Sequence, residues 1–143
     1  MAWIEPKTDW KIEYDAAGAF LGDFINYSDY NRIKNNVAYI ISIAPQVVID
    51  DYPTMGADKN AYTEYPRAGE WNAIENALHQ LAANIGSNFV AAVFMENGFT
   101  PNYSELNRIE SFSLRLKVQY ETAAAMKFKM PFTLGQQSND IRV

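Results

Sequence analysis

The sequence predicts a mainly α protein with a three-helix core of repeated, capped helix starts, and with short β or extended pieces at its N- and C-terminal ends. A nine-residue segment at 26–34 recurs almost unchanged at 102–110, and a looser copy lies between them at 69–75. Each copy is followed by apolar residues spaced as on one buried helix face. We therefore expect three related helices in a single domain, residues 1–143, a length that suits one hydrophobic core.

Both full copies of the repeat predict the first turn of a helix. Ser28 and Ser104 are suitable N-cap residues, because a serine hydroxyl accepts a hydrogen bond from a free backbone N–H of the first turn. Asn31 and Asn107 then fall three residues after the cap, where a capping box uses Glu or Gln. In the middle copy Gly69 takes the serine position and offers no side-chain acceptor. We thus expect the three helices to begin with similar N-terminal capping, and the cap of the middle helix to be the weakest.

The apolar stripes and the helix breakers set the expected boundaries. We expect helices over about 29–43, from between 66 and 70 to about 85, and from after 104 to about 126. We interpret residues 88–94 as helical, with a strand as the alternative, and residues 46–50 as a short strand or a packed loop. The stripes are Tyr30, Ile33, Val37 and Ile40; Trp71, Ile74, Leu78, Leu81 and Ile85; and Leu106, Ile109, Leu116 and Tyr120, with Ser113 interrupting the last.

Two terminal segments flank the predicted helical core of residues 26–126. The N-terminal arm, residues 1–25, is rich in apolar residues but lacks a helical period, and its alternating stretch at 10–14 predicts a short strand. An arm of this kind either packs across the helices or docks on a neighbouring subunit. Residues 127–143 are predicted to be an extended C-terminal tail, because residues 126–130 alternate and Pro131 interrupts them.

The segments 26–36, 64–78 and 102–110 resemble a helix start found in small structural proteins of tailed phages and prophages of Gram-positive bacteria. The likeness covers about residues 7–120 and includes the Trp-Asp motif at 7–10. It implies a non-enzymatic virion component of the tail, baseplate or connector, made in the host bacterial cytoplasm and located in the virion. Its implied partners are other copies of itself, as a homo-oligomer, and neighbouring virion proteins. It implies no catalytic residue and no cofactor.

Composition and charge narrow the possible partners. The net charge is −5 without any basic run, which disfavours nucleic-acid binding. The chain has no cysteine, so disulfides and thiolate metal sites are excluded. No apolar run reaches the roughly 18 residues of a membrane span, and the N-terminal residues lack the pattern of a signal peptide. We therefore expect a protein that binds neither nucleic acid nor membranes.

The residues that carry catalytic chemistry elsewhere have simpler interpretations here. His79 is the single histidine, which is too few for a histidine metal site or for a supported catalytic triad. Asp50, Asp51 and Asp58 lack the spacing of a calcium loop. The glutamates of the repeats could form a glycosidase pair, but capping and ion pairing account for them as well. We expect no enzyme, no metal and no cofactor; these glutamates are Glu70, Glu75, Glu105 and Glu110.

Aromatic and arginine side chains are the candidate interface residues, because both are enriched at protein contacts. The arginines could instead pair with a nearby acid within the chain. The tyrosines of the long connection at 51–66 could instead cover the hydrophobic core. An alternative function for the chain is a small phage-encoded inhibitor or regulator that binds a host protein, and a lytic enzyme is less favoured. The candidates are Trp3, Trp10, Arg32, Tyr52, Tyr62, Tyr65, Arg108 and Phe132.

Overall fold

The computed structural model describes residues 2–44, 52–96 and 101–129. It contains helices α1 (Tyr27–Ile43), α2 (Ala68–Asn84) and α3 (Tyr103–Lys129), and each helix contacts the other two. Within those ranges no β-sheet forms; the strand-like pairing is one isolated bridge. The predicted mainly α class with a three-helix core is confirmed.

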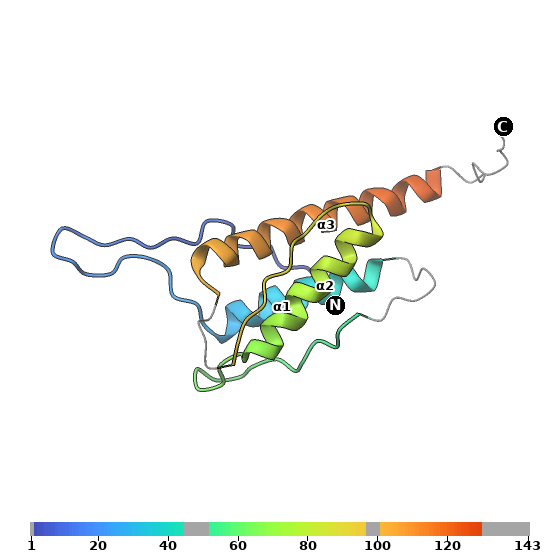
Figure 1. Cartoon of the computed structure of the whole chain (residues 1–143). Helices are drawn as coiled ribbons and strands as arrows, with labels where there is room; N and C mark the ends of the chain where they lie inside the picture. The colour runs from blue at the N-terminus through green and yellow to red at the C-terminus, as the bar shows by residue number, and fades with distance from the viewer. Residues whose placement is uncertain (1, 45–51, 97–100, 130–143) are drawn as a thin grey trace.

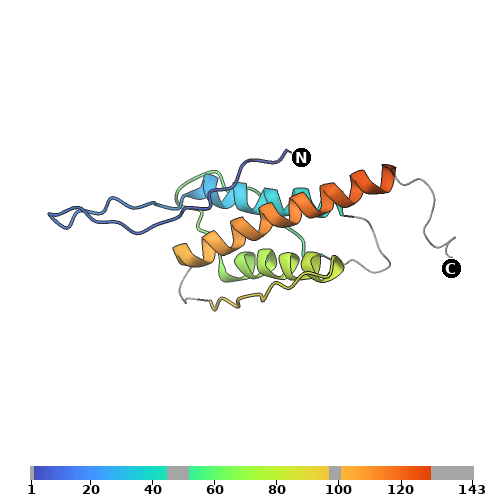
Figure 2. The same ribbon diagram turned by 90° about the horizontal axis from the view of Figure 1, so that it is seen from above.

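All three helices run in the same direction, with their N-terminal ends at one end of the bundle (Figures 1 and 2). Each helix is therefore preceded by an extended segment that runs back along the outside of the bundle. The described parts of these segments are residues 2–26, 52–67, 87–96 and 101–102. The described chain is thus three units, each an extended segment followed by a helix.

The predicted apolar stripes form the shared core. Twelve stripe residues are almost fully buried, while Ile85 is partly buried at the end of α2. Ser113 occupies the remaining stripe position of α3 without an orphaned hydroxyl, since its Oγ donates to the Ile109 carbonyl at 2.8 Å. Burial of these side chains is the main stabilising contribution to the bundle.

Helices α1 and α3 begin about two residues earlier than predicted, whereas α2 begins within the predicted interval. The predicted serine caps are wrong. Asn26 is the N-cap of α1: its side chain accepts from the N–H groups of Ser28 and Asp29, and the Asp29 carboxylate accepts from the Asn26 N–H. Asn102 and Glu105 make the same reciprocal pair at α3, at 2.8 and 3.0 Å. Asparagine caps as well as serine does, and only this register places the acid at the third position that a capping box requires.

Two further boundaries differ from the sequence prediction. Residues 88–94 are extended, not helical, in agreement with their β-branched and aromatic content. Residues 127–129 belong to α3 and not to an extended tail, because adding a residue to an existing helix gains a hydrogen bond for little extra ordering. The predicted strand at 46–50, the residues Asp50 and Asp51, and Phe132 lie outside the described residues.

The N-terminal arm divides into two parts with different surroundings. Residues 2–10 pack across α1 and α3, which is the first of the two predicted alternatives. Residues 11–24 leave the bundle as a long loop that projects beyond the N-terminal ends of the helices (Figure 1). Docking of this second part on a neighbour stays a prediction.

Candidate functional site

Each helix uses the asparagine of its repeat to hold one extended segment. The side-chain amide accepts from the backbone N–H of one residue and donates to the carbonyl of the same residue, so a single side chain satisfies both backbone groups. We call these three side chains the repeat asparagines. The pairs are Asn31 with Lys59 (2.8 and 2.8 Å), Asn72 with Phe94 (2.7 and 3.0 Å) and Asn107 with Trp10 (2.7 and 2.9 Å).

The three contacts close a ring around the bundle. Helix α1 holds the segment before α2, α2 holds the segment before α3, and α3 holds the segment before α1. The three units are thus related by an approximate threefold arrangement, in which the N-terminal segment contacts the last helix of the chain. Asn36 holds Ile4 by the same geometry, at 3.0 and 2.7 Å, which extends the grip on the first segment.

Two of the three helix–helix junctions carry an ion pair to a buried glutamate at equivalent positions. Arg32, one residue after its repeat asparagine, pairs with Glu110 of α3 at 2.8 Å. Arg108, in the same place on α3, pairs with Glu75 of α2 at 2.5 Å. Both glutamates lie three residues after a repeat asparagine and are 1% and 0% exposed. An unpaired buried carboxylate is costly, so each arginine is required by its partner.

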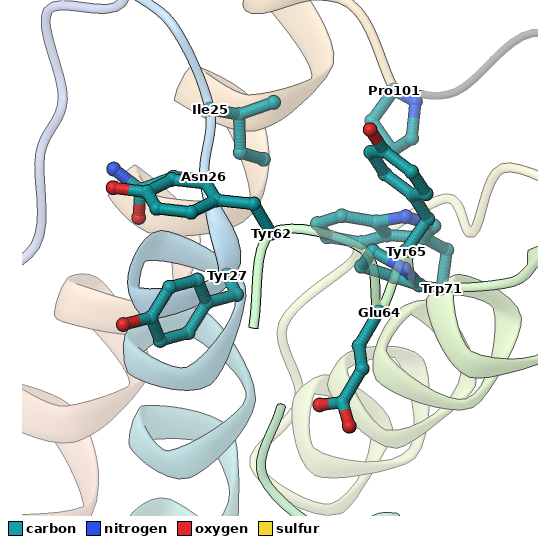
Figure 3. A pocket seen from close by; sticks show the side chains of 9 residues that line it. Ile25, Asn26, Tyr27, Tyr62, Glu64, Tyr65, Trp71 and Pro101 are labelled. Atoms are coloured by element: carbon teal, nitrogen blue, oxygen red, sulfur yellow. The ribbon is translucent and has the colours of Figure 1, made fainter. Parts of the chain in front are cut away.

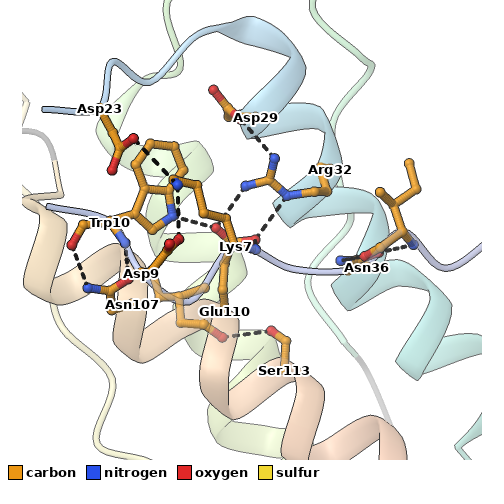
Figure 4. Close-up of polar contacts among 12 residues, drawn as sticks. Lys7, Asp9, Trp10, Asp23, Asp29, Arg32, Asn36, Asn107, Glu110 and Ser113 are labelled. Carbon is orange, nitrogen blue, oxygen red and sulfur yellow. Dashed lines mark hydrogen bonds and ion pairs between the residues drawn. The ribbon is translucent and has the colours of Figure 1, made fainter. Parts of the chain in front are cut away.

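The Glu110 carboxylate accepts hydrogen bonds from two elements, α1 and the N-terminal segment (Figure 4). Its carboxylate accepts from Arg32 Nε and Nη2, from the Lys7 N–H at 3.0 Å and from Trp10 Nε1 at 2.6 Å. Arg32 also donates to Asp29 at 2.7 Å, and its hydrogen bonds to the two acids raise the pKa of its guanidinium although burial opposes them. With its acceptor positions used inside the protein, this carboxylate is a structural link between α1, α3 and the N-terminal segment.

At the third junction, between α1 and α2, other residues occupy both positions of the ion pair. Ala73 stands where the other helices have arginine, and Lys34 stands where they have glutamate. The Lys34 ammonium is buried, donates to the Gly56 carbonyl at 2.8 Å and pairs with Asp58. The hydrogen bond from the Lys34 ammonium to Asp58, together with one from Asn35, lowers the pKa of the Asp58 carboxyl. The cation therefore binds the extended segment and not the neighbouring helix.

A second acid–base pair reinforces the same segment. Lys59 pairs with Glu70 at 2.8 Å. Burial alone would raise the pKa of Glu70, but hydrogen bonds from the Lys59 ammonium and the Arg67 N–H lower it below its ordinary value. The nearby Tyr30 is fully buried, and desolvation together with the charge of Glu70 raises the pKa of its hydroxyl.

Four of the eight candidate interface residues make contacts within the chain. Trp10 is buried, and Trp3 is half-buried against Tyr39 with ring centroids 5.8 Å apart. Arg32 and Arg108 make the intramolecular pairs that were the alternative interpretation. An interface role for these four stays a prediction that the structure does not require.

The remaining candidates divide by exposure. Tyr52 is partly buried against the core, whereas Tyr62 and Tyr65 are 71% and 77% exposed. His79 is an exposed helix residue whose Nδ1 lies 2.8 Å from the Phe89 carbonyl oxygen. Exposed candidates thus lie in the connection before α2.

The projecting part of the N-terminal arm is a β-like hairpin over residues 11–24. The backbone of Glu13 accepts from Leu21 at 2.6 Å, Lys11 accepts from Asp23 at 3.1 Å, and Tyr14 bridges Phe20. The Asp15 side chain accepts from two N–H groups of the turn, and Gly18 supplies the positive φ of 87° there. The hairpin is small, but its own backbone bonds define it.

One face of this hairpin is apolar and open to solvent. Ile12, Tyr14, Phe20 and Phe24 alternate onto that face, where the Tyr14 and Phe20 rings are 5.5 Å apart and the Phe20 and Phe24 rings 4.7 Å apart. Ile12, Tyr14 and Phe24 are 64%, 62% and 75% exposed. Sequence reasoning recognised only the first strand; the Ala17-Gly18 turn and the alternation after it were the signals for the second.

The hairpin is an addition to the threefold scaffold. In the second and third units the held residue precedes its own unit's repeat asparagine by 13 residues, from Lys59 to Asn72 and from Phe94 to Asn107. In the first unit Trp10 precedes Asn31 by 21 residues. The eight extra residues correspond to the hairpin, so the scaffold does not need it to close.

A hollow of about 370 Å³ lies beside the base of the hairpin, at the N-terminal end of the bundle (Figure 3). Its walls are mostly aromatic side chains and prolines, from the connection before α2 and from the starts of the helices. Trp71, Tyr62 and Tyr65 contribute rings to it, and Glu64 is its acid. The hollow and the hairpin together make an exposed apolar surface at this end of the bundle.

Comparisons with protein family models, with curated proteins and with solved structures find no match to this chain. Across the described ranges no helix is long and apolar enough to cross a membrane. Within the same residues no three His, Asp or Glu side chains are grouped so that they could hold a metal ion.

Proposed function

We propose that this chain is a non-enzymatic assembly protein of a tailed-phage particle, in its tail, baseplate or connector, that works by binding copies of itself and neighbouring virion proteins. The observation that carries the proposal is the projecting hairpin at 11–24. It is an eight-residue addition to a scaffold that closes without it, and it exposes an apolar face. Exposed apolar patches of this kind mark protein contacts.

The chemistry of the interior supports binding in preference to turnover. Each buried acid, Glu75 and Glu110, accepts hydrogen bonds on both carboxylate oxygens from an arginine and from backbone or indole N–H groups. These carboxylates are thus engaged inside the protein. The resemblance of the repeated helix starts to phage structural proteins supplies the biological setting. Because the repeat builds the scaffold, the partner-specific surface is expected outside it, on the hairpin.

Sedimentation velocity of the purified chain tests this proposal. We expect a concentration-dependent oligomer for the wild type and loss of that oligomer in the double variant Ile12→Ser, Phe24→Ser, with an unchanged melting temperature because both side chains are solvent-exposed. Val118→Ser, on an exposed part of α3, is the matched control and should behave as wild type. A strictly monomeric chain that retains a host protein through purification would instead support the inhibitor alternative.

A further inference from the structure

Trp71 lines the hollow at the N-terminal end of the bundle, and its indole carries a buried polar group without a partner. Trp71 is 2% exposed, and its indole N–H has no acceptor among the described residues. A buried donor left without an acceptor costs about 1–3 kcal/mol. An indole N–H is a donor only, so the group that would complete this site is an acceptor such as a peptide carbonyl.

The walls of the hollow fit an extended, proline-containing peptide. Pro66 and Pro101 line the hollow together with the exposed Tyr62 and Tyr65. Figure 3 shows Pro101 beside Tyr65, with Tyr62 on the opposite side. Grooves lined by aromatic rings bind proline-rich segments, whose extended backbone keeps its carbonyls free to accept hydrogen bonds. An aromatic wall with one buried N–H donor is the arrangement that such a segment requires.

The chain itself contains a segment of this chemistry directly after α3. Residues 130–134 read Met-Pro-Phe-Thr-Leu and follow Lys127 and Lys129. Residues 127–143 carry a net charge of +2, whereas the whole chain carries −5, which leaves −7 on residues 1–126. A basic segment is thus attached to an acidic body, and the hollow carries the acid Glu64.

This segment cannot reach the hollow of its own chain. Pro101 borders the hollow at the start of α3, and α3 has 27 residues, so its far end lies about 40 Å away. Residues 130–134 extend at most about 18 Å from that end. The occupant must therefore come from another molecule.

We propose that the hollow around Trp71 binds residues 130–134 of a second copy of this chain, with Phe132 or Pro131 between the tyrosine rings and a backbone carbonyl accepting from the Trp71 indole. The contact is head-to-tail, because the hollow borders the start of α3 and the segment follows the last residue of α3 in the sequence. Repeated contacts of this kind form a ring when the rotation closes and a filament when it does not. The inference rests on the proposed assembly function and names one of its contacts.

A labelled peptide of residues 127–136 tests the contact without involving the hairpin. The receptor is the full-length variant Phe132→Ser, whose own segment is disabled. We expect saturable binding by fluorescence anisotropy, weakened at least tenfold by adding Tyr65→Ser to the receptor and unchanged by adding Val118→Ser. The peptide carrying Phe132→Ser should not bind. Absence of saturable binding, or binding indifferent to Tyr65→Ser, would overturn the proposal.

The indole signal of Trp71 gives a second measurement. The chain has three tryptophans, so a ¹H–¹⁵N spectrum shows three indole signals, of which that of Trp71 is assigned by its loss in Trp71→Phe. Peptide binding should shift this signal, and an unmoved signal at saturation overturns the assigned hydrogen bond. If the peptide fails to bind while Ile12→Ser, Phe24→Ser still abolishes assembly, only this inference falls and the proposed function stands.

Discussion

Asn107 of α3 holds Trp10 by both of its backbone groups, at 2.7 and 2.9 Å, although the two residues are 97 positions apart. The contact turns the N-terminal segment into the third member of a ring whose other members are held by Asn31 and Asn72. Chain order alone would leave α3 without a following segment to hold. The N-terminal segment occupies the position that such a segment would take on α3, so the three contacts form a closed ring. The hairpin begins directly after Trp10, which this contact holds in place.

Replacing a repeat asparagine should destabilise the fold strongly for so small a change. Asn107→Ala leaves the backbone N–H and carbonyl of buried Trp10 without partners, which should lower the free energy of unfolding by about 1–3 kcal/mol. Chemical denaturation measures the change. Asn76→Ala, an exposed substitution of the same kind on α2, is the control and should change it by less than about 0.5 kcal/mol. Equal effects for the two variants would contradict the structural role.

The threefold relation makes a prediction at the junction that has lost its ion pair. Lys34→Glu alone should be destabilising, because it places a buried carboxylate beside Asp58 and removes the donor to the Gly56 carbonyl. Adding Ala73→Arg supplies the partner that the other two junctions have. The two substitutions should therefore show a favourable coupling of about 0.5–3 kcal/mol in a double-mutant cycle.

The matched comparison is the existing pair of Arg32 and Glu110. Arg32→Met should cost about 3–5 kcal/mol, because it leaves a buried carboxylate without its charge partner. Strict additivity of Lys34→Glu and Ala73→Arg would show that the α1–α2 junction is not equivalent to the other two.

The sequence predicts the helices well because their stripes depend only on local spacing. Tyr30 and Ile74 are buried as their periodicity requires. The use of the repeat asparagines was not predictable in the same way, since Asn31 and Asn107 were interpreted as capping residues and instead hold segments 28 and 97 positions away. A side chain's long-range partner depends on the parallel arrangement of the helices, which no local pattern encodes.

The hairpin shows the same limit for the candidate site. Its first strand was visible as alternation at 10–14, but its exposure follows from the eight-residue difference between units, which is recognisable only once Trp10, Lys59 and Phe94 are seen to be equivalent. Tyr62 and Tyr65 were named as interface candidates, with covering the core as the alternative, and the structure shows both side chains exposed. The hollow that they line, with the buried indole donor of Trp71, could be recognised only from the structure, because its residues come from separate parts of the chain.

Stability should fall on the acid side because of the pairs at the third junction. Glu70 and Asp58 have lowered pKa values in the folded protein, so their contribution is fully present above their unfolded pKa values, about 4, and is lost as pH falls through the folded values. Urea unfolding between pH 3 and 7 should show this decline. Lys59→Met removes the hydrogen bond and the charge that lower the pKa of Glu70, so its share of the loss disappears and the decline should be smaller than in the wild type. Lys11→Met, which removes the exposed pair with Glu13, should keep the wild-type profile.

Gly22 offers a way to remove the hairpin without touching the bundle. A Cβ atom at this position would lie 2.6 Å from the Lys11 carbonyl oxygen and 2.9 Å from the Glu13 nitrogen, and these are backbone atoms that cannot rotate away. Gly22→Ala should therefore separate the two strands, and the amide signals of residues 11–24 should shift toward unfolded values in a ¹H–¹⁵N spectrum.

The bundle itself should survive this substitution, because Trp10 stays held by Asn107 and the core lies beyond the hairpin. The melting temperature should stay within a few degrees of wild type while the oligomer is lost, since the apolar face at Ile12 and Phe24 is no longer assembled. Gly69→Ala is the control, because a Cβ there meets nothing within 4 Å. A Gly22→Ala chain that keeps the wild-type sedimentation profile would show that assembly does not use the hairpin.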